Sequence, residues 1–151
     1  MDFARTINPD LAVANCQLSP AQIQQAAEAG YKSVLNLRSP QEEGTLADEQ
    51  AQVEAAGLSY VNLPVKPNGI TPDLTDQVLQ ALDDLPKPML AHCRTGVRAG
   101  AMALIYLATR SGMDAATALT TSQENGFDWD AHPQIKQVII KQVIGQYIDN
   151  H

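Results

Sequence analysis

The sequence predicts an α/β protein in which helices flank a central, mostly parallel sheet of four to five strands. Two observations lead to this fold class. Short apolar runs typical of buried strands alternate along the chain with longer stretches of helical periodicity. In addition, glycine or proline stands at most of the boundaries between these segments, where such residues end helices and mark turns.

The expected elements follow one another in an alternating order. Strands are expected at residues 11–16, 32–38, 58–65 and 89–92. Helices are expected at residues 21–29, 45–56, 71–85, 98–109, 114–125 and 133–148, with a turn at 127–130. Ser19 and Pro20 are a start signal for the first helix, and Gly30 is its stop signal. In the third helix the apolar residues share one face with a period of 3.6.

Length and composition limit what the chain can be. Its 151 residues fit one domain, residues 1–151. A net charge of −7 argues against a nucleic-acid partner, because phosphate binding needs a basic face. The longest apolar run, residues 101–108, is too short to span a membrane. Two cysteines and an N-terminus without an apolar leader favour a reducing compartment, so we expect a cytoplasmic protein.

One segment carries the chemistry. The apolar strand 89–92 ends in His92 and is followed by Cys93, by four further residues and by Arg98, where a helix begins. The first N–H groups of a helix lack internal partners, and together with the helix dipole they form an anion site. A thiol held there loses its proton easily, and an arginine fork suits an oxyanion. We therefore expect Cys93 and Arg98 to be catalytic.

The remaining candidate residues surround this pair. The residues expected to bind the anion or the transferred sulfur are Arg94, Thr95, Gly96 and Val97. His92 is as compatible with orienting Cys93 as with a buried core position, whereas Cys16 is expected to pack in the core. The chain contains no cysteine and histidine cluster with zinc spacing, so we expect neither a metal nor another cofactor.

The segment His92-Cys93-x-x-Gly96 resembles the loop of dual-specificity, cysteine-dependent phosphatases. The run from Val34 to Arg38, with Glu42 or Glu43 nearby, strengthens the likeness. More closely, residues 1–125 resemble the bacterial phosphatase-like family linked to beta-lactamase hydrolase-like proteins (DUF442). This resemblance implies a cysteine-phosphatase-like three-layer sandwich, with the cysteine loop at the centre of the sheet.

Two departures from the phosphatase pattern affect the expected reaction. Phosphatases of this type place five residues between cysteine and arginine, and a hydroxyl residue usually follows the arginine. Here the loop is one residue shorter and Ala99 follows Arg98, which resembles the loop of single-domain rhodaneses. Our first hypothesis is therefore a sulfurtransferase. Cys93, as a persulfide, would carry sulfane sulfur from thiosulfate or a low-molecular-weight persulfide to a thiol or cyanide.

The alternative is a phosphatase that works through a phosphorylated Cys93. Such a reaction needs an acid for the leaving alcohol, and residues 66–69, where the family places an aspartate, contain no carboxylate. Asp73 and Asp76 are the next candidates, although Asp73 also fits the first turn of a helix, where it complements the dipole. A third hypothesis is a module that binds an anion without turnover.

The expected partners follow from the same features. An isolated positive site in an acidic protein suits a small anionic substrate, namely thiosulfate, a persulfide or a phosphate ester. We expect no contact with nucleic acid or membrane. Apolar residues of the last helix, 133–148, cover more than one face. This pattern fits either a helix buried on two sides or a homodimer formed through it.

Overall fold

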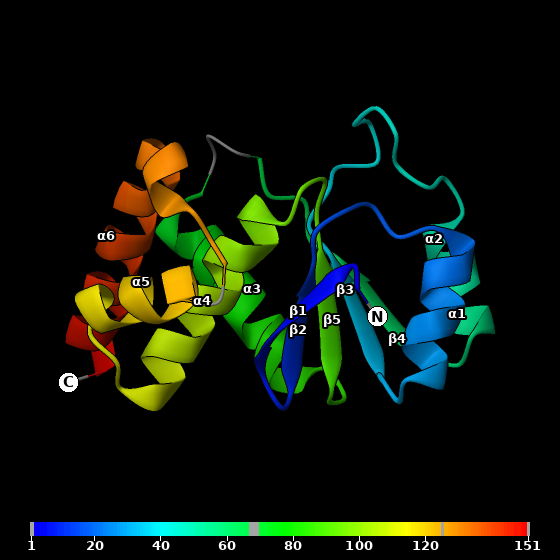
Figure 1. The fold of residues 1–151 in the computed structure, drawn as a ribbon, viewed down its shortest axis with the longest axis horizontal. Coiled ribbons are helices and arrows are strands. Elements are labelled where there is room, and N and C mark those ends of the chain that lie inside the picture. The colour runs from blue at the N-terminus through cyan, green and yellow to red at the C-terminus, as the bar shows by residue number, and fades with distance from the viewer. Residues whose placement is uncertain (1, 67–69, 125, 151) are drawn as a thin grey trace.

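A computed structural model of the chain describes residues 2–66, 70–124 and 126–150, with the side chains of 145–150 left out. The strands are β1 (Ala4–Asn8), β2 (Leu11–Ala14), β3 (Ser33–Asn36), β4 (Ser59–Asn62) and β5 (Met89–His92). The helices are α1 (Pro20–Glu28), α2 (Glu49–Ala55), α3 (Pro72–Asp84), α4 (Val97–Ser111), α5 (Ala115–Glu124), the 3-10 turn η1 (Trp129–Ala131) and α6 (Pro133–Asn150). Together they form three layers, with the sheet in the middle (Figure 1).

The sheet is five-stranded, in the order β1-β2-β5-β3-β4, and β5 lies at its centre. All neighbouring strands are parallel except β1, which runs antiparallel to β2. The register pairs Leu11 with Met89 and Asn36 with His92, so β2, β3 and β5 end at one edge. Ligands of parallel sheets bind beyond this carboxyl edge. The predicted α/β class and three-layer arrangement are thereby confirmed.

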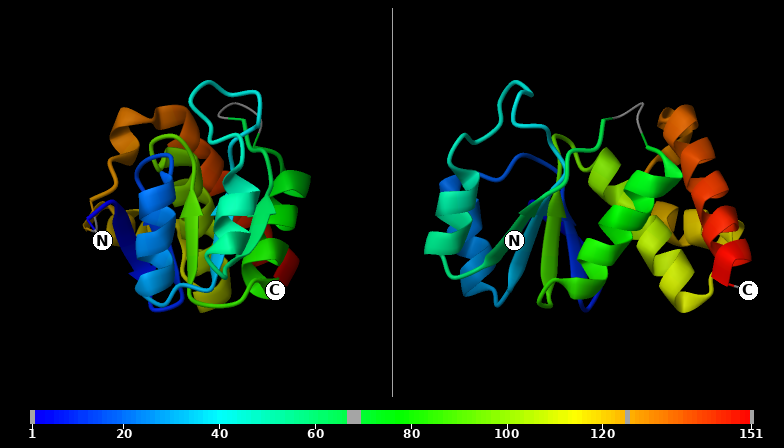
Figure 2. Two further views of the ribbon diagram at one scale, coloured as in Figure 1. Left: turned by 90° about the vertical axis from the view of Figure 1, so that its right-hand side faces the viewer. Right: turned by 180° about the vertical axis from the view of Figure 1, so that it is seen from behind.

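Each face of the sheet has its own core. Helices α1 and α2 cover one face, while α3, α4, α5 and α6 lie on the other (Figures 1 and 2). Side chains of β5 alternate between the two cores, since Leu90 packs on the α1 side whereas Met89 and Ala91 pack on the α4 side. Cys93 continues the alternation into the α4 core.

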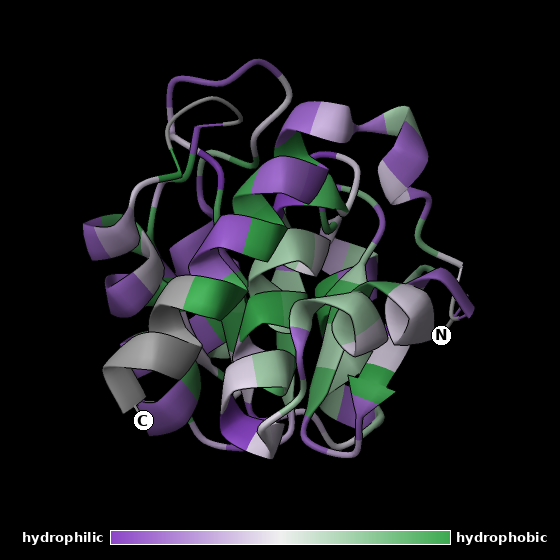
Figure 3. Cartoon of the chain, turned by 90° about the vertical axis from the view of Figure 1, so that its left-hand side faces the viewer, coloured by the Kyte–Doolittle hydropathy of each residue, from purple (hydrophilic) through white to green (hydrophobic). Residues whose placement is uncertain are grey.

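Helix α4 is almost entirely enclosed, which fixes its N-terminal turn next to β5. Most of its residues from Arg98 to Ala108 are buried, and Figure 3 shows hydrophobic segments gathered in this interior beneath a more polar periphery. The helix also approaches the segment after α5 closely. A Cβ on Gly100 would lie 2.4 Å from the Phe127 ring, so only glycine allows this contact.

Several boundaries differ from the sequence prediction. Strand β1 was not predicted because it lies at an edge of the sheet, where most of its side chains are at least partly exposed and no apolar alternation is needed. Helix α2 begins at Glu49 rather than residue 45, since the Thr45 hydroxyl instead contacts the carbonyl oxygen of Glu42. In the turn around residues 127–130, Trp129 is buried and donates from Nε1 to Ser122 Oγ over 2.7 Å.

The last helix only partly fits the expectation for its apolar residues. Ile135, Ile139 and Val143 are buried, whereas Ile144 is 49% exposed. The side chains of Tyr147 and Ile148 lie outside the described residues, so the homodimer stays a prediction. Among the helices that the structure describes, none has the length and apolar character needed to cross a membrane.

Candidate active site

The predicted loop lies where β5 ends and α4 begins. His92 is the last residue of β5, Cys93 follows it, and α4 starts at Val97 with Gly96 as its N-cap. Gly96 has a φ of +90°, a conformation that disfavours any residue with a Cβ. A Cβ there would also lie 3.2 Å from the Ala14 carbonyl oxygen. Glycine thus lets the chain turn from strand to helix beside β2.

The sulfur of Cys93 is buried within this turn. The residue is only 1% exposed, and its Sγ accepts the backbone N–H of Gly96 at 3.2 Å and that of Ala99 at 3.5 Å. The two donors therefore face the atom that carries the negative charge of a thiolate nucleophile.

Arg98 lies close to this sulfur but is held by a carboxylate. Its two terminal nitrogens donate to both oxygens of Glu42, over 2.8 and 2.9 Å, and one of them also donates to the Val65 carbonyl oxygen. The hydrogen bond that Arg98 donates to Glu42 raises the pKa of Arg98, and the neighbouring Cys93 raises it further. The same arginine lowers the pKa of Glu42 to about 2. Glu42 thus fixes the direction of the arginine fork.

His92 lies on the opposite face of the sheet from the sulfur. Its Nε2 is 2.7 Å from Glu49 Oε2, and both side chains are buried, with exposed fractions of 0% and 2%. Its Nδ1 lies 3.5 Å from the carbonyl oxygen of Cys93. The structure thus shows His92 as a buried residue whose ring contacts a carboxylate, which fits the core position expected as one of its two roles.

The other loop residues occupy different environments. Arg94 and Thr95 are exposed, whereas Gly96 is buried and Val97 is half-buried. The second cysteine, Cys16, is half-buried after β2, with its sulfur 3.8 Å from Gln22 Oε1. Neither cysteine forms a disulfide. Within the described part of the chain, no group of three or more histidine, cysteine or acidic side chains could hold a metal ion.

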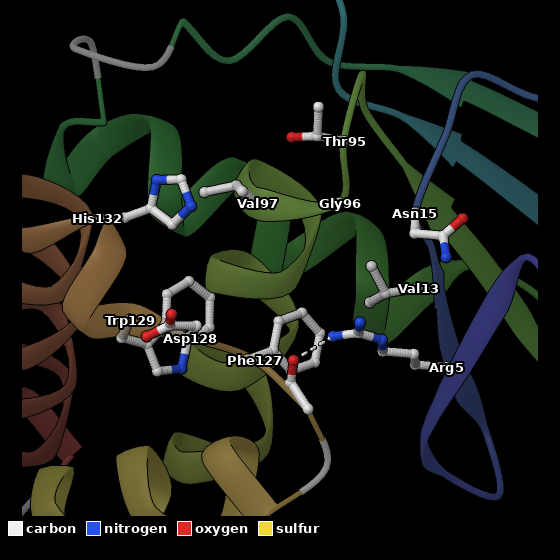
Figure 4. A pocket seen from close by; sticks show the side chains of 11 residues that line it. Arg5, Val13, Asn15, Thr95, Gly96, Val97, Phe127, Asp128, Trp129 and His132 are labelled. Atoms are coloured by element: carbon white, nitrogen blue, oxygen red, sulfur yellow. Dashed lines mark hydrogen bonds between the residues drawn. The ribbon is translucent and has the colours of Figure 1, made fainter.

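A pocket of about 170 Å³ adjoins the loop (Figure 4). Thr95, Gly96 and Val97 line one side of it. Arg5 and Phe127 lie together in this pocket, with the guanidinium carbon 5.1 Å from the ring centroid, and His132 lies further along it. The volume is close to that of a cavity that holds one benzene ring. A bound group of that size would contact the loop.

The two candidate acids lie on α3. Asp73 is exposed in its first turn, and Asp76 is exposed one turn later. The chain reaches α3 from Val65, which accepts a hydrogen bond from Arg98, and the start of α3 lies on the same side as the end of β5 (Figure 1). Residues 67–69, within the segment where the family aspartate was sought, lie outside the described residues.

Sequence reasoning missed three residues that support the site, namely Gln17, Arg38 as a buried partner, and Glu49. The three form one hydrogen-bonded chain, in which Gln17 joins Arg38 to Glu49 and Glu49 contacts His92. Glu49 stands in the first turn of α2, where an acidic residue usually complements the dipole. Its burial depends on pairing across the fold, which no local pattern reveals. The one local signal was the pair of acidic residues Glu42 and Glu43 after Arg38, because Glu42 is the residue that holds Arg98.

Comparison with known proteins assigns the family. The profile of the beta-lactamase hydrolase-like protein, phosphatase-like domain, matches residues 2–111. The chain belongs to this family. A beta-lactamase hydrolase-like protein of Xylella fastidiosa strain Temecula1 is 34% identical over 97 residues, which cover 62% of this chain and 22% of the relative. The matched region thus spans about a fifth of the length of that relative.

Solved structures share the fold. A candidate phosphatase (DUF442) from Shewanella putrefaciens CN-32 superposes with a TM-score of 0.80 at 24% identity, covering 96% of this chain and 90% of its own. P. aeruginosa TpbA in complex with pTyr gives a TM-score of 0.77 at 19% identity, covering 97% and 89%. These likenesses confirm the cysteine-phosphatase-like fold that the sequence resemblance implied.

The expectation of sulfur transfer is wrong. The family is a phosphatase-like one, and a solved structure that shares the fold is a candidate phosphatase (DUF442). The number of residues between Cys93 and Arg98 does not decide which anion the loop can hold. The donors to the sulfur do not end at the arginine, because the N–H of Ala99 also points to it. A loop one residue shorter therefore does not by itself imply a smaller set of donors.

The Glu42–Arg98 pair predicts a pH-dependent stability. Glu42 has a pKa lowered from 4.5 to about 2, so its charge stabilises the fold above pH 4.5, and this contribution is lost as the pH falls toward 2. Glu42→Gln should cost about 2 kcal/mol of unfolding free energy at neutral pH and much less near pH 2. Urea unfolding at both pH values measures this, with the exposed neighbour Glu43→Gln as control. An equal cost at both pH values would contradict the ion-pair account.

Proposed function

We propose that the protein is a cysteine-dependent phosphatase that hydrolyses phosphate monoesters through Cys93. The observation that carries this proposal is the buried sulfur with two backbone N–H donors at the N-terminus of α4. Membership of the phosphatase-like family supports the same reaction. The substrate is a small anionic phosphate ester, consistent with the chain's isolated positive site.

The reaction has two steps. In the first, the Cys93 thiolate attacks phosphorus, the bond from phosphorus to the ester oxygen breaks, and the leaving alcohol takes a proton from a carboxylic acid. In the second, water attacks the phosphocysteine and gives a proton to the carboxylate left by the first step, the phosphorus–sulfur bond breaks, and inorganic phosphate leaves with the Cys93 thiolate restored. Both steps pass through a phosphoryl group whose charge is spread over three equatorial oxygens.

The loop supplies the groups that meet this charge. Backbone N–H groups between Arg94 and Arg98 and the fork of Arg98 suit a phosphoryl group, because such groups need no reorganisation when charge develops. Glu42 and the Val65 carbonyl oxygen already hold the Arg98 side chain in place. Its guanidinium therefore does not have to be ordered when the substrate binds. The pocket beside Thr95 offers room for the organic part of the ester.

Hydrolysis of p-nitrophenyl phosphate tests the proposal. Cys93→Ser should lower kcat by at least about a thousandfold, since the nucleophile is lost. Cys16→Ser is the matched control and should keep the wild-type rate, because its thiol lies outside the loop. Turnover that survives in Cys93→Ser would sink the proposal. Phosphate binding without turnover of any phosphate monoester would favour the binding module instead.

Asp73 and Asp76 are the two candidates for the acid that protonates the leaving alcohol, and replacing each in turn compares them. A general acid must hold its proton, so its titration makes the rate fall on the alkaline side of the pH profile. We expect one of Asp73→Asn and Asp76→Asn to remove this alkaline fall and to lower kcat by about a hundredfold. The other should leave the profile unchanged. If both variants keep the wild-type profile, neither residue is the acid.

A further inference from the structure

The pocket beside the cysteine loop is lined in part by an arginine from a distant part of the chain. Arg5 belongs to the edge strand β1, whereas Thr95, Gly96 and Val97 belong to the loop and to the start of α4. Figure 4 shows the Arg5 guanidinium extending from β1 toward the ring of Phe127. The two reaction steps at Cys93 give this charge no role.

The register of the sheet places Arg5 near the loop. Arg5 is paired with Val13 of β2, and Val13 is paired with Ala91 of β5. Since neighbouring strands lie about 4.8 Å apart, the Cα atoms of Arg5 and Ala91 are about 10 Å apart. Residues paired in this way present their side chains on the same face of a sheet. Val13, Ala91 and Cys93 lie in the core under α4. Arg5 therefore extends over the face that also holds the nucleophile.

Two contacts fix the direction of the Arg5 side chain. Its Nη1 donates to the Gly126 carbonyl oxygen over 2.6 Å, and its guanidinium carbon lies 5.1 Å from the centre of the Phe127 ring. Gly126 has a φ of +98°, and a Cβ there would lie 3.3 Å from the guanidinium carbon. The arginine is thus held before any ligand arrives, so that little side-chain entropy is left to lose on binding.

The charge of Arg5 is not neutralised within the described part of the chain. No ion pair found among the described residues involves Arg5, and its one side-chain hydrogen bond to them uses a single guanidinium N–H. Arg110 also lies over an aromatic ring, 5.4 Å from the centre of Tyr106, but it pairs with Asp83 over 2.7 Å. Arg5 is exposed and keeps both its charge and further donors for a ligand.

The acidic residue of the pocket lies away from Arg5. Asp128 precedes the 3-10 turn η1, and its Oδ1 accepts the Ala131 N–H over 3.3 Å. Figure 4 shows Asp128 beside Trp129, whereas Arg5 lies on the other side of Phe127 in this view. An anionic group of a ligand is therefore repelled near Asp128 and attracted near Arg5, which favours one orientation in the pocket.

We propose that Arg5 is a specificity-determining residue that binds a second anionic group of the substrate. This inference rests on the proposed function, because it requires the loop to hold the phosphate that is hydrolysed. The substrate is then a phosphate monoester whose organic part carries a carboxylate or a second phosphate. The pocket of about 170 Å³ leaves room for roughly one benzene ring between the two anionic groups.

Binding to Cys93→Ser, measured by calorimetry at about pH 8, tests the proposal without turnover. The ligands are 4-carboxyphenyl phosphate and 4-carbamoylphenyl phosphate, which share their shape but not the second charge, together with the corresponding 3-isomers. We expect the carboxylate to bind about fivefold to tenfold more tightly in at least one isomer. A stronger preference for benzene-1,4-diyl bisphosphate would identify phosphate rather than carboxylate as the second group.

Variants of Arg5 in the same background show whether this residue carries the preference. Arg5→Gln should abolish it and leave the Kd of the carbamoyl compound unchanged, whereas Arg5→Lys should keep most of it. Arg110→Gln is the matched control and should change neither Kd, because Arg110 is already paired with Asp83. If Arg5 only tied β1 to Gly126, its replacement would not distinguish the charged ligand from the neutral one.

A second variant keeps the test decisive if Arg5→Gln does not fold. Arg5→Met retains an unbranched stem against Phe127 but lacks the charge, and it should lose the preference in the same way. Equal binding of the charged and neutral ligands, no binding of either, or a preference that survives the loss of the Arg5 charge overturns this inference. An Arg5-dependent preference in a protein whose wild type turns over no phosphate monoester overturns the proposed function alone.

Discussion

The sulfur of Cys93 lies in the turn between the central strand and its following helix, where two backbone N–H groups point to it. This contact needs β5 at the centre of the sheet, so that its end is enclosed by β2 and β3. It also needs a residue without a Cβ at Gly96, because the turn has a positive φ and passes close to the backbone after β2. The enclosed packing of α4 keeps the donors in place.

The polar groups around the loop follow from this arrangement. A cysteine and an arginine buried at a helix start bring charge into a region poor in water, and each charge requires a partner. Glu42 pairs with Arg98 on one side of the sheet, while the buried carboxylate of Glu49 contacts His92 Nε2 on the other. Gln17 and Arg38 join the two pairs. The site is thus supported by both layers of helices and loops rather than by the loop alone.

The sequence predicted the parts of this arrangement that depend on local pattern. The strand 89–92, the helix after it and the roles of Gly96 and Arg98 as neighbours of the sulfur were found from apolar runs, glycine and spacing. Strand β1 was missed, because an exposed edge strand needs no apolar alternation. Glu49 and Gln17 were missed for another reason. Their partners are 43 and 21 positions away along the chain, and only the folded topology brings them together.

The reaction was misjudged because loop length was treated as a measure of the anion that fits. The groups that face the sulfur depend on where the backbone N–H groups point. One of them belongs to Ala99, which follows Arg98. Asp73 and Asp76 both fit the general acid by residue type and by position near the start of α3. Neither property distinguishes one from the other. Family membership overturned the expectation of sulfur transfer, which the residues of the loop alone had favoured.

Trapping the covalent intermediate tests the account most directly. The protein is mixed with p-nitrophenyl phosphate, quenched in acid during the first turnover, and examined by intact mass and by mass spectrometry of its peptides. We predict the gain of a single phosphoryl group, located on Cys93 and absent from Cys93→Ser. Ester hydrolysis without a phosphorylated protein, or with the phosphoryl group on another residue, would contradict the account.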